Sequence, residues 1–284
     1  MPTEQEILKV IRKIIPNSKK YLFDDAAIVE KNLIVTTDTL VENTHFTQKT
    51  YIPEELGWKA LAVNLSDIAA MGGKPLYALV SLSLPKNITL KWIKDFYKGL
   101  NNCAKKYKTE IIGGNLARSK ETNITITIIG KLIGKTIGKR SNAKPADLVF
   151  VTGAFGNAAK KPIPQIVLGK KIMKLTKRAA LMDSSDGLAD CLIQIAKESN
   201  VKIIVEESNI PMSKNLSKNT NLTLYGGEDY ELVGTASEND CKKLKKIKSI
   251  KIIGKVLKGS GAFLKQKNNK LVKLDMKKTY EHFK

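Results

Sequence analysis

The sequence predicts an α/β fold in two lobes, and three observations support this expectation. Short runs of β-branched residues alternate with longer helical segments along all 284 residues. Hydrophobic residues make up 42% of the chain, which is enough to form a sizeable core. Gly, Lys and Pro cluster around residues 135–146, between two halves that each show the alternation. A chain of this length suits two domains, and we expect them at residues 1–139 and 140–284.

The first half alternates strands with helices. An amphipathic helix opens the chain, with Thr3 and Glu6 placed to form a capping box. Further helices are expected at 53–73, which has Pro53 near its start and a Gly pair at its end, and at 89–107. Strands are expected at 26–29, 33–39, 110–114 and 122–134.

The second half continues this alternation. A Pro-containing link after residue 157 leads into a helix that ends near residue 175. A second helix follows the turn after "AALM", and Ser185 or Asp186 is its expected cap. Strands are expected at 147–153, 179–182, 202–207, 230–236 and 251–256.

The net charge of +22 invites comparison with nucleic-acid-binding proteins. Only four of the 49 cationic residues are arginines, and the lysines are spread along the chain without interleaved aromatics. This pattern favours a solvated lysine surface with a general attraction for anionic substrates. We therefore expect no nucleic-acid partner, while a basic, non-catalytic nucleic-acid-binding protein stays open as an alternative from another class.

Features that would indicate a membrane protein or a secreted protein are missing from the sequence. No run approaches the roughly 20 apolar residues of a membrane span, and the N-terminal helix lacks the apolar core of a signal peptide. Three scattered cysteines without a C-x-x-C pair indicate neither a disulfide framework nor a zinc site. We expect a cytoplasmic protein with no membrane partner.

The stretch "GKLIGKT" at 130–136 is similar to a phosphate-binding P-loop. A P-loop needs four residues between its first Gly and the Gly-Lys pair, so that successive N–H groups surround a phosphate, and here there are three. A β-branched run precedes the stretch and turn-forming residues follow it, whereas a P-loop opens a helix. We therefore expect a strand that ends in turns, and any ATP site must be built differently.

Several acidic residues lie at the ends of apolar strands or inside an apolar helix of this basic chain. They are Asp24, Asp25, Asp38, Asp67, Asp183, Asp186, Glu228 and Asp229. One such Asp is most often a cap or a turn residue, as Asp186 alone would be. Carboxylates gathered in a low-dielectric place repel one another unless a cation or proton neutralises them. Because Mg²⁺ prefers oxygen ligands and shares its shell with phosphates, the pattern predicts an Mg-dependent phosphoryl-transfer enzyme.

Eight stretches, in this order, resemble the thiamine-monophosphate kinase family, of the superfamily that includes aminoimidazole ribonucleotide synthetase. They are "DDAAIV", "TTDTLVENTHF", "GWKALAVNLSDIAAMGGKP", "IIGGN", "KRSNAKPAD", "MDSSDGL", "GGEDYEL" and "YEHF". The resemblance implies a synthetase-like fold, with an N-terminal sheet lobe that pairs in a homodimer and a C-terminal α/β lobe. It also implies direct transfer of the γ-phosphoryl group from ATP to thiamine phosphate, giving ADP and thiamine diphosphate, with several Mg²⁺ ions.

The same resemblance implies the site residues. The expected metal shell is Asp25, Thr36, Thr37, Asp38, Asp67, Asn115, Asp183 and Asp186, and Asp183 and Asp186 are also the expected catalytic residues. The expected ATP contacts are Tyr97, Gly114, Asn115, Arg140 and Ser185, and the expected contacts of thiamine phosphate are His45, Glu228 and Tyr280. Arginine suits phosphate because its guanidinium donates hydrogen bonds in pairs. An aromatic face and an acid suit the cationic thiamine rings.

Some residues depart from the family pattern. Asn115 replaces the usual Asp, so it keeps a ligand oxygen and loses a charge, and Phe23 stands where Gly is usual. The segment after residue 160 is shorter than in common relatives, which we expect to trim the second lobe and not the chemistry. Another ATP-dependent enzyme of the same superfamily is the nearest alternative.

Overall fold

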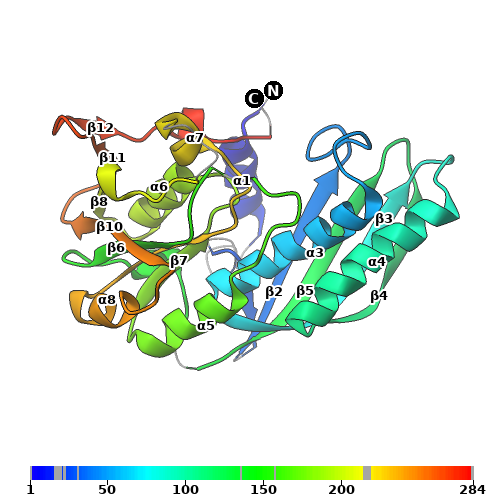
Figure 1. Ribbon diagram of the computed structural model, residues 1–284, viewed down its shortest axis with the longest axis horizontal. Helices are drawn as coiled ribbons and strands as arrows, with labels where there is room; N and C mark the ends of the chain where they lie inside the picture. The colour runs from blue at the N-terminus through cyan, green and yellow to red at the C-terminus, as the bar shows by residue number, and fades with distance from the viewer. Residues whose placement is uncertain are drawn as a thin grey trace.

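The computed structural model describes residues 2–15, 21, 24–30, 32–134, 136–156, 158–213 and 219–282. It contains two mixed β-sheets with helices packed against them (Figure 1). The five-stranded sheet has the strand order β1-β2-β5-β3-β4, and the seven-stranded sheet has the order β12-β11-β8-β10-β6-β9-β7. The expected two-lobed α/β fold is therefore confirmed. In the described part of the chain, no helix is both long and apolar enough to cross a membrane.

The first sheet and its helices come from the first half of the chain. The elements are α1 (Glu4–Ile14), β1 (Ala27–Val29), β2 (Leu33–Val41), α3 (Pro53–Ala70), β3 (Gly73–Leu84), α4 (Leu90–Tyr107), β4 (Glu110–Arg118) and β5 (Asn123–Leu132). The capping box of Thr3 and Glu6 is present at the start of α1. Strand β5 ends at Leu132, and the described residues 136–139 form no helix, as expected for a stretch that is not a P-loop; Lys135 lies outside the described residues.

Strand β3 was not among the expected strands, although it lies inside the first sheet between β5 and β4. Its first residues include Gly73 and Pro75, which normally mark a turn or a sheet edge. The register between β3 and β5 shifts between Pro75 and Tyr77, and this bulge lets proline lie in an inner strand. The sequence signal was therefore masked by a local irregularity.

The second sheet and its helices come from the second half of the chain. The elements are β6 (Leu148–Thr152), α5 (Ile166–Leu175), β7 (Ala179–Asp183), α6 (Leu188–Glu198), β8 (Lys202–Glu206), α7 (Thr220–Tyr225), β9 (Leu232–Ala236), α8 (Glu238–Leu244), β10 (Ile250–Leu257), β11 (Gly261–Lys265) and β12 (Leu271–Lys273). Single 3-10 turns occur at η1 (Arg140–Asn142), η2 (Glu207–Asn209) and η3 (Met276–Lys278). The domain boundary that we place at 139/140 lies between the two sheets, and its exact position stays a prediction.

Helix α3 joins the two lobes. It packs on β2, β5 and α4 of its own lobe and also on α5 and β7 of the other lobe. Because it is covered on all sides, it is apolar almost all round, with Leu61, Leu65 and Ile68 fully buried. Its partner β7 is an edge strand of the second sheet, so the C-terminal end of that strand lies beside α3. The lobes therefore meet where α3 and β7 both end.

The turn between β7 and α6 differs from our expectation. The N-cap of α6 is Gly187, with no side-chain cap, so the predicted capping by Ser185 or Asp186 is wrong. Gly187 has a φ of 105°, which is strained for any residue with a Cβ atom, and it turns the chain into the helix. The side chains of Ser185 and Asp186 are thereby left to face the space between the lobes.

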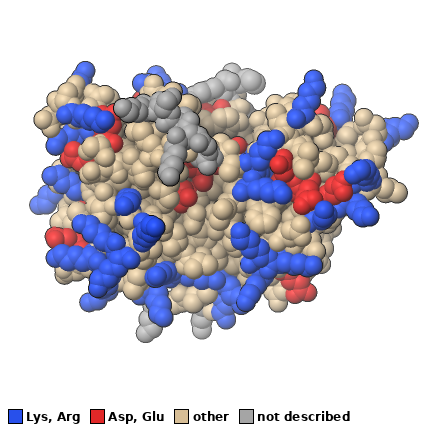
Figure 2. All heavy atoms as spheres, viewed as in Figure 1, with Lys and Arg blue, Asp and Glu red and all other residues tan. Residues whose placement is uncertain are grey.

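The surface charge follows the composition. Lysine and arginine side chains are spread over the face shown in Figure 2, as expected for a solvated lysine surface. A small group of acidic side chains lies near the middle of this face, between the two lobes. Other acidic groups lie toward both sides of this face.

Candidate active site

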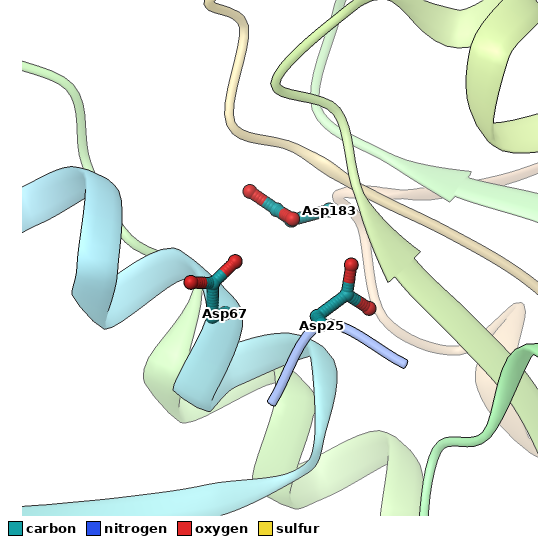
Figure 3. Close-up of side chains that lie close together, drawn as sticks. All are labelled: Asp25, Asp67 and Asp183. Atoms are coloured by element: carbon teal, nitrogen blue, oxygen red, sulfur yellow. The ribbon is translucent and has the colours of Figure 1, made fainter. Parts of the chain in front are cut away.

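Three aspartates from distant parts of the chain gather between the lobes (Figure 3). Asp25 lies just before β1, Asp67 in the last turn of α3, and Asp183 at the end of β7. One carboxylate oxygen from each lies within 4.8 Å of those of the other two. The structure thus brings together three residues of the predicted metal shell, and their role as ligands stays a prediction.

The environment of these carboxylates favours their protonated forms. Burial, followed by the charges of Asp38, Asp183 and Asp25, raises the pKa of Asp67 well above its usual value. Burial and the nearby Asp25 likewise raise the pKa of Asp183 well above its usual value. Burial, with Asp186 and Asp25, raises the pKa of Asp38 to about 6. A cluster of this kind requires either protons or a bound cation near neutral pH.

Arg140 offsets part of this negative charge. Its Nη2 lies 2.6 Å from Asp25 Oδ1, and its backbone N–H donates to Asp24 Oδ1 over 2.9 Å. Attraction to Asp25 raises the pKa of Arg140 despite its burial, and burial still leaves the pKa of Asp25 raised. Asp25 Oδ2 is buried and has no hydrogen-bond partner among the described residues. An unpaired buried oxygen of a carboxylate that lies beside two further carboxylates is a suitable cation ligand.

Strand β2 carries three predicted metal-shell residues on alternating faces. Thr36 faces α3, where its Oγ1 lies 2.5 Å from Asp67 Oδ2. Asp38 faces the same side, and its N–H donates to Asn64 Oδ1 over 2.9 Å. Thr37 faces the opposite side of the sheet, where its Oγ1 lies 3.0 Å from Thr127 Oγ1. The structure therefore brings Thr36 and Asp38 to the site, and it does not bring the Thr37 hydroxyl there.

Two cavities meet at the turn that follows β7. The first, of about 650 Å³, is lined by Asp67 and Asp183, and the second, of about 460 Å³, by Arg140 and α1. Ser185 and Asp186 line both cavities. Burial also raises the pKa of Asp186. The acidic cluster thus opens to the first cavity through Asp67 and Asp183, and the second cavity adjoins it at Ser185 and Asp186. Each space is large enough for part of a small molecule.

The predicted substrate contacts His45, Glu228 and Tyr280 all line the first cavity. His45 Nδ1 accepts the Val41 N–H over 2.9 Å, which requires an unprotonated Nδ1. Burial, with the nearby His282 and Lys59, lowers the pKa of His45. These three residues, which the resemblance implies as contacts of thiamine phosphate, therefore line one space.

Two residues at or beside this cavity were missed by the sequence reasoning: His282 lines it, and Lys59 contacts its lining residue Glu228. The His282 ring lies 5.0 Å from the His45 ring, and its Nδ1 lies 3.3 Å from the Tyr280 hydroxyl. The chain has only two histidines, and their scarcity was the available signal. Lys59 lies 2.5 Å from Glu228 Oε1, but as one of many lysines it carried no signal beyond its place in an apolar helix.

The three acidic residues of the loop that contains Glu228 have different roles. Asp229 accepts the Gly156 N–H at 2.8 Å and 2.9 Å, and Glu231 accepts the Thr152 hydroxyl over 2.5 Å. Both contacts lie inside the second lobe and hold the loop in place. Only Glu228 of these three lines the first cavity. Asp229, which stood beside Glu228 in the sequence pattern, is therefore a structural residue here.

Three predicted ATP contacts lie away from the acidic cluster within this chain. They are Tyr97 on α4 and Gly114 and Asn115 on β4. Strands β5 and β3 lie between β2 and β4 in the sheet. At ordinary strand spacing, the distance from β2 to β4 is therefore roughly 14 Å. A Cβ atom on Gly114 would lie 1.7 Å from the Val80 carbonyl oxygen, so the backbone alone explains this glycine. Asn115 pairs with Ser81 on the sheet face opposite to Asp38.

Comparison with known proteins places the chain in a family. Residues 23–135 match the family model described as AIR synthase related protein, N-terminal domain. A thiamine-monophosphate kinase of Bacillus subtilis is 38% identical over 92% of this chain and 92% of its own length. The chain belongs to the thiamine-monophosphate kinase family. This membership confirms the resemblance drawn from the eight sequence stretches.

Solved structures agree with membership of the thiamine-monophosphate kinase family. A structure described as AaThiL complexed with AMPPCP and TMP has a TM-score of 0.87 and 31% identity, covering 99% of this chain and 97% of that one. The thiamine monophosphate kinase of Aquifex aeolicus has a TM-score of 0.84 and 30% identity, covering 95% and 97%. The likeness extends over nearly the whole chain, and the effect of the segment after residue 160 stays a prediction.

Proposed function

We propose that the protein transfers the γ-phosphoryl group of ATP to thiamine phosphate and forms thiamine diphosphate. The observation that carries this proposal is the acidic cluster beside a cavity that adjoins a second one at Ser185 and Asp186, in a chain of the thiamine-monophosphate kinase family. AaThiL, which is similar over 99% of this chain, is complexed with AMPPCP and TMP. A fold of the same size with the same order of motifs supports the same pair of substrates.

The acceptor is proposed to occupy the first cavity. Glu228 pairs with Lys59 of α3. Asp67 lies eight residues after Lys59 on the same helix, which is roughly 12 Å further along the helix axis. The acid at this end and the ring of Tyr280 in the cavity wall suit the cationic thiazolium ring of thiamine. The acidic cluster at the other end suits a phosphate only with metal ions between them. This orientation places the acceptor phosphate beside Asp67 and Asp183.

The donor phosphates are proposed to enter from the side of Arg140 and Ser185, which line the second cavity. The transferring group would then lie between the two cavities, beside Asp186, with donor and acceptor oxygens on opposite sides. Arg140 offsets charge there, and Thr36 holds Asp67 in position. The acceptor needs no general base, because a phosphate monoester already carries about −1.5 to −2 charges at neutral pH. The catalytic role of Asp183 and Asp186 is therefore the placement of charge.

The residues present fit Mg²⁺. Asp25, Asp67 and Asp183 offer oxygens within 4.8 Å of one another, and Asp25 Oδ2 has no other partner in the described chain. Asp38 and Asp186 extend this set toward the first cavity. Bound Mg²⁺ supplies neutralisation of the phosphate charge that builds up during transfer. The proposed ligands come from both lobes.

Mg²⁺ binding is expected to strengthen as the pH rises through about 6. The pKa of Asp38 is raised to about 6 and that of Asp67 well above its usual 3.8, so the metal-free folded protein holds extra protons in this window. The free energy of unfolding of the metal-free protein therefore falls as the pH rises through this window. Mg²⁺ must displace the same protons, so it binds more strongly at the higher pH. The gain in melting temperature from Mg²⁺ over EDTA should grow between about pH 5 and about pH 8. A gain that does not change with pH would contradict metal binding at these carboxylates.

We also propose a homodimer that forms through the free face of the first sheet. Thr37, Thr127 and Leu79 form one row across this face, and Leu79 is 37% exposed. Asn115 lies on the same face, although the sequence assigns both Asn115 and Thr37 to the ATP and metal site. A second copy on this face would contact both Thr37 and Asn115, because both lie on it.

Leu79→Glu is expected to convert this dimer into a monomer of 31.4 kDa. The new carboxylate would be buried without a partner between two sheets. Light scattering after size-exclusion chromatography measures the mass of the variant. If the mass falls to that of a monomer, the rate of thiamine diphosphate formation should fall too. Leu90→Glu is the matched control, because Leu90 is 89% exposed on α4 and lies away from this face. An active monomer in the wild type, or an unchanged dimer in Leu79→Glu, would contradict the proposed face.

ADP release with different acceptors tests the function. With ATP and Mg²⁺, we expect release that depends on thiamine phosphate and is much slower with thiamine or inorganic phosphate. ADP release at a rate that does not depend on thiamine phosphate would favour another ATP-dependent enzyme of the superfamily. Salt-dependent binding of DNA or RNA without any nucleotide turnover would favour the basic nucleic-acid-binding alternative.

A further inference from the structure

Lys59 is a buried cation whose hydrogens are all used by the protein. Its side chain is 1% exposed, and its Nζ lies 2.5 Å from Glu228 Oε1, 3.0 Å from the Tyr51 hydroxyl and 3.4 Å from the His45 carbonyl oxygen. An ammonium group has three hydrogens to donate, and here there are three acceptors. No hydrogen remains for a ligand, so Lys59 acts on the first cavity only through the groups that it holds.

The loop that Lys59 holds belongs to the other lobe. Glu228 and Tyr230 have φ values of 66° and 53°, in the left-handed region that residues with a Cβ atom rarely adopt. Their N–H groups donate to the Ser185 and Ser184 carbonyl oxygens over 2.7 Å and 2.9 Å. The strained loop is thus fixed to the turn after β7 on one side and to Lys59 of α3 on the other.

We propose that Lys59 is a positioning residue that sets the preference of the first cavity for a cationic acceptor. It holds Glu228 by one oxygen, while the Glu228 side chain stays 37% exposed and lines the cavity. The held carboxylate presents negative charge to the ligand at a fixed place, which favours a positively charged ring over an uncharged ring of the same shape. This inference rests on the proposed function and names the source of its acceptor specificity.

A purely structural role is the competing explanation. Buried ion pairs often add little to stability, yet removing one partner is strongly destabilising. A structural role would therefore lower the melting temperature of a Lys59 variant and would alter the use of both substrates together. A positioning role changes the use of the acceptor alone.

The test compares wild type with Lys59→Met, which keeps the length of the side chain and removes its charge. We expect KM for thiamine phosphate to rise about tenfold or more, as for loss of one charged hydrogen bond, while KM for ATP stays unchanged. The preference for thiamine phosphate over its analogue with an uncharged thiophene ring should fall in the variant. Lys98→Met is the matched control, because Lys98 pairs with Glu54 on the exposed surface of the same lobe.

Glu228→Gln and the double variant Lys59→Met/Glu228→Gln complete the test. If Lys59 acts through Glu228, the double variant should show the same KM for thiamine phosphate as Glu228→Gln alone. The double variant also leaves no unpaired carboxylate, so it gives a result even where Lys59→Met does not fold. Additive effects, or equal changes in both KM values, would overturn the positioning role. A wild-type protein that forms no thiamine diphosphate would instead overturn the proposed function.

Discussion

Asp183→Asn is expected to reduce the formation of thiamine diphosphate by about 10²-fold to 10³-fold or more. Asp183 is 2% exposed, and its pKa is raised well above the usual value by burial and by the neighbouring Asp25. Asparagine keeps the shape of the side chain and removes the charge that the proposed Mg²⁺ ions require. The same loss of charge relieves repulsion in the metal-free protein. Its melting temperature in EDTA should therefore stay equal or rise.

Asp147→Asn is the matched control for this result. Asp147 is equally buried in the second lobe, but it pairs with Arg178 and lies outside the cluster. Its replacement should lower the melting temperature and leave turnover nearly unchanged. Turnover and melting curves in EDTA and in Mg²⁺ are measured for both variants. An Asp183→Asn protein that melts at a lower temperature and keeps its turnover would show that Asp183 is structural.

Arg140→Met is expected to lower both stability and turnover. The Arg140 guanidinium lies 2.6 Å from Asp25 Oδ1, and the Asp25 side chain is only 2% exposed. Removal of one partner from such a pair costs about 3–5 kcal/mol, because a buried charge is left uncompensated. For a chain of this size, that loss corresponds to a fall in melting temperature of about 10 °C. Loss of a positioned cation beside the phosphates should lower turnover by about 10²-fold.

Arg178→Met separates the two effects of this change. Arg178 holds Asp147 in a two-point contact, with both N···O distances at 2.7 Å, away from the cavities. Its loss should lower the melting temperature by a similar amount and leave the rate per folded molecule unchanged. If both arginine variants lose turnover in proportion to their stability, Arg140 has no special role at the phosphates.

The sequence indicated which types of residue form the site, but not how they come together. The types of residue at Asp25, Asp67 and Asp183 indicated a divalent cation and phosphate, and the structure brings these carboxylates together. Their convergence depends on how α3 packs against β7, and no spacing along the chain contains that contact. Local patterns also misled where backbone irregularities intervene, as at Pro75 in β3 and at Gly187 before α6.

Other site residues were hidden by composition. Lys59 is one lysine among many, and only its complete burial against Glu228 distinguishes it. The assignments of Thr37 and Asn115 came from the family resemblance alone. The alternation of β2 and the pairing of β4 place both on the free face of the sheet, opposite to the side of Asp38. These residues therefore stay predictions.

The central claim is that this site transfers the γ-phosphoryl group of ATP directly to thiamine phosphate. The most direct measurement uses ATP labelled with ¹⁸O in its γ-phosphoryl group, together with Mg²⁺ and thiamine phosphate, and detects the products by mass spectrometry. We predict thiamine diphosphate that carries the labelled phosphoryl group in the wild type, and almost none in Asp183→Asn. Unlabelled thiamine phosphate beside labelled inorganic phosphate would contradict the claim, because ATP would then be hydrolysed without transfer.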